Sequence, residues 1–342
     1  MTLYATENSQ KELGAISDML SAYGSYGGAV DPGGLMADAL NGEMNLSPGS
    51  VIAAIIKELL DNLTENIGLT AIILGICILS AVAANFAGSN SPFYELNENT
   101  SAIIVSILLS GLFIGGVQFA VEAATGMESV SVAVIPLIAA LGLKTGSTVF
   151  VAVAQYVSAV VCWFFVPLAV LYGALGLCDC LTDKFPVSEL RGGVKSLFVW
   201  GLGLTMTVFF CVTAVTGAVS GQFSGVAGKT VKYAGNLIPF VGSYLSESAD
   251  LVFSGLCAVK SAAGIGASAA VFITGISPFL KLFAYTVLLR IAAFIATPFG
   301  NGRIKSVIGN ISEAFTMLMG MVGLIGVFFI LNIAMFTSVR FS

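Results

Sequence analysis

Residues 313–340 read EAFTMLMGMVGLIGVFFILNIAMFTSVR, and no residue from 314 to 339 carries a charge. About 20 consecutive apolar residues are enough for a helix to cross the hydrocarbon core of a bilayer. An uncharged tract of this length therefore predicts a transmembrane helix. The number of similar tracts elsewhere in the chain then decides the fold class.

Five further uncharged tracts are long enough to span a membrane. They cover residues 66–94, 99–121, 145–178, 196–228 and 261–280. Three shorter tracts, 129–143, 233–246 and 291–302, each contain a proline, and their length predicts re-entrant, broken or interfacial helices. We therefore predict an all-α fold: a polytopic transmembrane helical bundle with six or seven spans plus broken or re-entrant helices.

The composition agrees with a membrane protein. Of the 342 residues, 57% are hydrophobic and only 10% are charged, and the mean hydropathy is +0.96. A soluble domain carries about a quarter charged residues, so this chain lacks the polar surface that water requires. The net charge of −5 comes without a basic cluster, which argues against a nucleic-acid partner. The basic residues divide evenly between the two faces of a six-span scheme, so their distribution leaves the orientation open.

Residues 1–65 differ from the rest and are predicted to form an acidic, water-exposed region before a transmembrane domain at 66–342. This region holds nine acidic residues against Lys11 and Lys57. Ser47-Pro48 is a helix-start signal, and apolar residues then recur at helical spacing from Val51 to Leu63. The resulting amphipathic helix is expected to continue into the first span. It either lies on the bilayer or the bundle, or docks to a partner. The first 20 residues contain three acids and no apolar run, so they do not form a cleavable signal peptide. Either the first span acts as the insertion signal, or a further segment precedes residue 1.

Catalytic and metal-binding motifs are weak. Histidine is absent, which removes the commonest general base and metal ligand. Cys178-Asp179-Cys180 has no further Cys or His nearby to complete a metal site. Gly228-Lys229-Thr230 resembles the end of a phosphate-binding loop, but Phe223 stands where the first glycine belongs. We therefore predict a protein that is not an enzyme and has no catalytic residue, cofactor or metal.

Small residues and prolines punctuate the apolar tracts. Glycines recur four apart at Gly111/Gly115 and form a stripe at Gly320, Gly323 and Gly326. Such spacing lets membrane helices approach closely, and we expect packing inside the bundle, with contact to other subunits as the alternative. Prolines within or beside apolar runs are expected to kink or break helices. These are Pro136, Pro167, Pro239, Pro278 and Pro298.

Charges close to the apolar segments have two interpretations. Glu247 and Asp250 follow the Pro239 segment, and Lys281 and Arg290 bracket an apolar stretch. Lys281 and Arg290 are nine residues apart, so on one helix they point to opposite sides. These charges either extend to the membrane interface at helix ends or line a hydrated path.

The C-terminal half resembles a known family. From Lys229 the chain reads KTVKYAGNLIPFVGSYLSESADLVFSGLCAVKSAAGIG, and from Ser277 it reads SPFLKLFAYTVLLRIAAFIATPFG. This pattern is similar to the stage III sporulation protein AE family, with a layout of spans that fits over about residues 60–340. The motif positions, to which the resemblance assigns a structural, partner or conduit role, are Lys229, Lys232, Asn236, Pro239, Gly242, Asp250, Lys260, Pro278, Lys281, Arg290, Pro298 and Gly300.

The resemblance implies a membrane-embedded subunit of a sporulation channel or export complex. Such a complex links the mother cell and the forespore and sustains late forespore gene expression. The implied location is the mother-cell membrane around the forespore. The implied partners are the lipid bilayer, other membrane and ring-forming subunits, and an ATPase. An alternative from the paired proline-containing segments is a stand-alone secondary transporter for a small solute.

Overall fold

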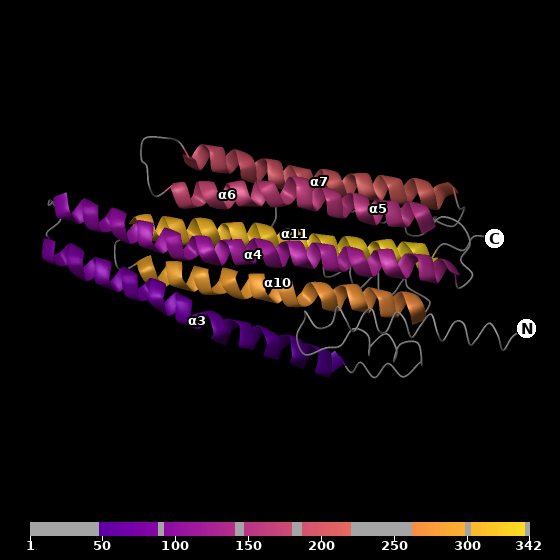
Figure 1. Cartoon of the computed structure of the whole chain (residues 1–342), viewed down its shortest axis with the longest axis horizontal. Helices are drawn as coiled ribbons and strands as arrows, with labels where there is room; N and C mark the ends of the chain where they lie inside the picture. Colours follow the sequence, from indigo (N-terminus) through magenta and orange to yellow (C-terminus); the bar gives the residue numbers. More distant parts are fainter. Residues whose placement is uncertain are drawn as a thin grey trace, which may run out of the picture.

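The computed structural model describes residues 48–87, 92–140, 147–179, 187–219, 262–297 and 302–338, and within these ranges it is helical and contains no strand. The helices are labelled in Figure 1. They are α3 (Pro48–Ala87), α4 (Pro92–Ala140), α5 (Ser147–Val160), the π-helix η1 (Val161–Phe165), α6 (Val166–Cys178), α7 (Val187–Val219), α10 (Ala262–Ala296) and α11 (Gly302–Ser338).

Six helical segments in the described ranges are long and apolar enough to cross a membrane. They are Ile52–Phe86, Phe93–Ile135, Phe150–Cys178, Val187–Val212, Ala267–Ala296 and Gly302–Met335. Each overlaps one of the six long uncharged tracts, and α5, η1 and α6 together make the third. The prediction of an all-α bundle with six or seven spans is confirmed, and six of them lie in the described residues.

The first helix begins where the sequence predicts. α3 starts at Pro48 and continues without interruption to Ala87, so the amphipathic stretch and the first span form one helix. Proline suits the first turn of a helix because its missing N–H would have no partner there. Residues 1–47 lie outside the described ranges, so the acidic, water-exposed character of this region stays a prediction.

The prediction of broken helices at residues 129–143, with Pro136, and around Pro278 is wrong. α4 runs through Pro136 to Ala140, and α10 runs through Pro278 to Ala296, after which α11 starts at Gly302. The tract at 129–143 is short because Glu128 and Lys144 bound it, and the tract at 291–302 is short because Arg290 and Arg303 bound it. A charge inside a helix does not end it, and proline is tolerated in membrane helices where nearby groups satisfy the freed carbonyl. The tract 233–246, with Pro239, lies outside the described residues, as does Pro298.

Pro167 interrupts the regular α-helical pattern, as expected of a proline within an apolar run. The π-helix η1 directly precedes α6, which has proline in its first turn. A proline ring collides with the carbonyl of the residue four positions earlier, here Trp163. A π-turn widens the helix at this point and lets the chain continue through it.

The centre of the bundle is formed by α4, α10 and α11, which contact one another more extensively than any other three helices (Figure 1). α11 is the most buried of the six candidate spans. At one depth the aromatic rings of Phe113, Phe315 and Tyr285 pack in series, with centroids 6.0 and 5.4 Å apart. At another depth, Met127 fills the space between α10 and α11. A Cβ placed at Gly275 or Gly326 would lie 2.8 or 3.5 Å from the Met127 sulfur.

The two glycine patterns have different outcomes. In the predicted stripe, Gly323 and Gly326 pack against Phe279 and Met127 inside the bundle, whereas a Cβ at Gly320 would have nothing within 4 Å among the described residues. A Cβ at Gly111 or Gly115 would have nothing within 4 Å among the described residues. The expectation that this second pair packs within the bundle is therefore wrong for the described part of the chain.

The α3–α4 hairpin is displaced along the bundle. Gly116 of α4 contacts Phe315 of α11, and Met127 contacts Gly326, so the two helices run parallel with a constant offset. The first residue of α4, Pro92, then lies about 16 Å beyond the first residue of α11, at 1.5 Å per residue. Figure 1 shows the tips of α3 and α4 projecting past the other helices at one end. The large apolar side chains Leu79 and Phe86 of this tip are exposed.

Candidate functional site

An ion pair joins the starts of two uncharged tracts. Lys195 on α7 contacts Glu313 on α11 through its Nζ and the Oε1 of the carboxylate. The hydroxyl of Tyr172 on α6 donates to Oε2 of the same carboxylate at 2.5 Å. Tyr172 is only 1% exposed, so the carboxylate is the partner that a buried phenol requires. One acidic group therefore serves two neighbouring helices.

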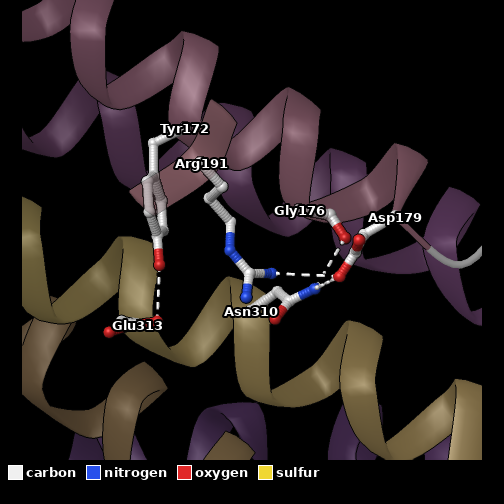
Figure 2. A network of polar contacts seen from close by, with 6 residues as sticks. All are labelled: Tyr172, Gly176, Asp179, Arg191, Asn310 and Glu313. Atoms are coloured by element: carbon white, nitrogen blue, oxygen red, sulfur yellow. Dashed lines mark hydrogen bonds and ion pairs between the residues drawn. The ribbon is translucent and has the colours of Figure 1, made fainter. Parts of the chain in front are cut away.

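A second group of contacts lies one turn away. Arg191 Nη1 lies 3.4 Å from Asp179 Oδ2, and the Arg191 guanidinium lies 5.7 Å from the centre of the Tyr172 ring. The Asn310 amide donates to the Gly176 carbonyl at 3.1 Å and to Asp179 Oδ2 at 3.2 Å (Figure 2). Asn310 can reach α6 because Gly176 has no side chain: a Cβ there would be 3.0 Å from Asn310 Cβ.

We name Tyr172, Asp179, Arg191, Lys195, Asn310 and Glu313 the polar cluster. It contains two cations and two anions, so its charges balance. Lys195 and Glu313 stand immediately before the uncharged tracts that start at 196 and 314, and Asp179 follows the tract that ends at 178. The polar cluster therefore marks one edge of the apolar part of α6, α7 and α11. None of its six side chains is an activated nucleophile. The polar cluster is a network of ion pairs and hydrogen bonds that holds α6, α7 and α11 together.

An apolar groove lies between α5 and α7, further along the bundle. Its volume is about 490 Å³, and Tyr156, Val157, Val208 and Phe209 are among the lining side chains. Phe209 also packs on Phe328 of α11, with ring centroids 4.2 Å apart. The lining is almost entirely apolar, as expected of a surface that faces lipid.

Three of the predicted motif residues lie in the described ranges, all on α10. Pro278 is inside the helix. The Lys281 ammonium lies 4.9 Å from the centre of the Phe119 ring of α4, a cation–π contact. Arg290 is exposed near the end of the helix. The other nine lie outside the described residues: Lys229, Lys232, Asn236, Pro239, Gly242, Asp250, Lys260, Pro298 and Gly300. The functional assignment of all twelve motif residues stays a prediction.

The polar cluster was not predicted as a site. A signal for part of it existed, because Asp179, Lys195 and Glu313 each border an uncharged tract, and in an antiparallel six-span scheme these three borders share one membrane face. Arg191 and Lys195 are also four residues apart, on one side of a helix. Tyr172 and Asn310 had no such signal, since each sits among apolar residues that look like packing positions.

Comparison with known proteins identifies the family. The model of the family described as stage III sporulation protein AE matches residues 30–339. The chain is 23% identical over 329 residues to stage III sporulation protein AE of Bacillus subtilis (strain 168), covering 93% of this chain and 82% of that protein. The family match starts earlier than the expected residue 60 and includes part of the N-terminal region. No solved structure matches. The sequence resemblance is confirmed, and the chain belongs to the stage III sporulation protein AE family.

Proposed function

We propose that this protein is a membrane-embedded subunit of a sporulation channel or export complex that links mother cell and forespore and is needed for late forespore gene expression. The observation that carries the proposal is the family match over residues 30–339 on a chain with six helices long and apolar enough to span a membrane. The role is one of scaffold or conduit, without catalysis.

The proposed setting is the mother-cell membrane around the forespore. Partners there would be an ATPase, other membrane subunits and ring-forming subunits that extend the passage between the two membranes. A rigid platform suits such a role. The polar cluster supplies rigidity, because it connects α6, α7 and α11 by charge-assisted hydrogen bonds that fix how the helices lie against one another.

The packing of the central helices bears on where a conduit would lie. Met127 occupies the space between α4, α10 and α11, and the rings of Phe113, Phe315 and Tyr285 occupy it at another depth. The described residues therefore leave no passage through the middle of these three helices. A conduit would lie on the outer surface of the bundle, where this chain meets other subunits.

Deleting the gene in its endospore-forming host tests the proposal. We expect late forespore gene expression, followed with a fluorescent reporter, to fail after engulfment, and mature spores to be lost. Early forespore reporters serve as the control and should remain active, and an intact gene copy should restore spores. Normal numbers of heat-resistant spores in the deletion strain would contradict the proposed role.

The alternative of a stand-alone secondary transporter has lost part of its basis. It rested on two similar proline-broken segments, and the one at Pro136 is part of the continuous helix α4. Uptake of a solute by liposomes containing only this purified protein would still favour that alternative.

A further inference from the structure

Three of the candidate spans share one apolar layer: α7, α11 and the span formed by α5, η1 and α6. On α11 it extends from Glu313 to Asn332, about 28 Å at 1.5 Å per residue, which is close to the thickness of a hydrocarbon core. The contacts Lys195–Glu313 and Phe209–Phe328 place α7 across this layer. The contacts Tyr172–Glu313 and Asn332–Phe150 place α5, η1 and α6 across it. Between these contacts, none of the three spans carries a charged side chain.

α4 carries an acid inside the same layer. Since Gly116 contacts Phe315 and Met127 contacts Gly326, Glu122 lies at about the depth of residue 321 of α11. That depth is about 12 Å from the Glu313 edge and about 16 Å from the Asn332 edge. A glutamate side chain is too short to reach either edge, so extension to the interface does not account for this charge.

Glu122 belongs to an exposed polar stripe. Gln118, Glu122 and Thr125 are all exposed and recur at helical spacing on α4, which we name the α4 stripe. No described residue forms an ion pair with Glu122. Lys281 lies at a similar depth but has a partner, because Phe119 covers its ammonium group. Between the layer and the hairpin tip, the same outer side of α4 carries the exposed apolar residues Ile107 and Ile114.

α3 carries charges at a similar depth. Asn97 of α4 donates to the Ser80 carbonyl of α3 at 2.9 Å, which sets the register of this antiparallel pair. Both helices rise by the same distance per residue, so Lys57, which precedes Ser80 by 23 residues, lies at about the depth of α4 residue 120, which follows Asn97 by 23 residues. Lys57 and Asp61 are exposed. The charges inside the layer are therefore on α3, α4 and α10, whereas the side formed by α5, α6 and α7 is uncharged there.

A charge is costly at the centre of a hydrocarbon layer, so an exposed, unpaired carboxylate there is stable only beside water or another polar surface. We propose that the α4 stripe faces water at membrane depth, and that this side of α4 lines the aqueous passage of the assembly. The inference rests on the proposed function and deepens it by identifying the α4 stripe as the water-facing surface of the subunit. It fits the closed centre of the bundle, which leaves the outer surface for a passage.

Thiol labelling in membranes of sporulating cells tests the assignment. Thr125→Cys places a thiol on the α4 stripe, and Val208→Cys places one on the exposed apolar side of α7, where Phe209 fixes a similar depth. The probe is a membrane-impermeant, cationic methanethiosulfonate, read by the mass of the labelled peptide. Thiols react as thiolates, which form readily only in contact with water. We therefore expect the Thr125→Cys thiol to react with the probe at least roughly tenfold faster than the Val208→Cys thiol.

The native Cys211 is an internal control, since it is exposed on α7 and should react as slowly as the Val208→Cys thiol. Both substitutions are at exposed positions, and equal abundance of the two variants in the membrane checks that they fold. Equal rates at the two introduced thiols, whether both slow or both fast, would overturn the proposal. This outcome is distinct from failure of the proposed function, because the deletion phenotype is scored without reference to α4.

Discussion

Replacing Gly116 by alanine is expected to destabilise the folded protein by about 1–3 kcal/mol, the usual range for overpacking a filled core. The added Cβ would lie 2.2 Å from Cε1 of Phe315. Phe315 is fully buried, and its ring is held between Phe113 and Tyr285, so it has no free space to move into. The measurement is the midpoint of thermal unfolding in detergent, with loss of monodisperse protein as the signal.

The adjacent glycine is the matched control. Gly115→Ala adds the same methyl group on the same helix, and nothing among the described residues lies within 4 Å of it. We expect its midpoint to be unchanged or slightly raised, since alanine favours a helix more than glycine does. Combining Gly116→Ala with Phe315→Leu should recover part of the loss by making room for the methyl group. Similar midpoints for the two single variants would show that α4 and α11 do not pack as described.

Replacing Glu313 by leucine is expected to destabilise the protein by about 1–3 kcal/mol, because the buried Tyr172 hydroxyl loses its acceptor. The ion pair with Lys195 is partly exposed, so its own contribution is expected to be smaller, at about 0–1 kcal/mol. Thermal unfolding in detergent again provides the measurement. α6 and α7 should separate from α11 first, since the polar cluster connects them.

Two further variants separate these contributions. Glu313→Gln keeps an oxygen that can accept from Tyr172 but removes the charge, so it should cost less than Glu313→Leu. Tyr172→Phe in the Glu313→Leu background removes the orphaned hydroxyl and should restore part of the stability, because deleting both partners of a buried hydrogen bond is less harmful than deleting one. If Glu313→Leu and Glu313→Gln unfold alike and Tyr172→Phe rescues nothing, the hydrogen bond is not a stabilising contact.

The fold class was predictable because hydrophobicity is local. The residues of the uncharged tract 314–339 are enough to predict a membrane-spanning helix, whatever the rest of the chain contains. The same holds for the tracts at 66–94 and 196–228. The start of α3 at Pro48 was predictable for a similar reason, since a cap signal acts within one turn. The errors arose where a charge was read as the end of a helix. Glu122 and Lys281 lie within continuous helices, one exposed and the other covered by an aromatic ring.

The candidate site was only partly predictable. The charges at the borders of the apolar tracts were visible, but their pairing was not, because Lys195 and Glu313 are 118 residues apart in the chain. The glycines show the same limit. Gly115 and Gly116 are neighbours in sequence and have the same intrinsic preferences, yet only Gly116 faces a ring. Which of two adjacent residues points inward depends on the rotation of the whole helix against its neighbours.

By itself, the sequence determined the all-α class, with six or seven apolar helices, and the family, since both follow from residue types read in order along the chain. Only the tertiary structure decided how deep each helix lies relative to the others, and therefore that Glu122 shares a layer with uncharged tracts. The physical reason is that the offset between helices is set by side chains interlocking across them, such as Met127 between Gly275 and Gly326. Hydrophobic length permits a range of depths, and packing selects one of them.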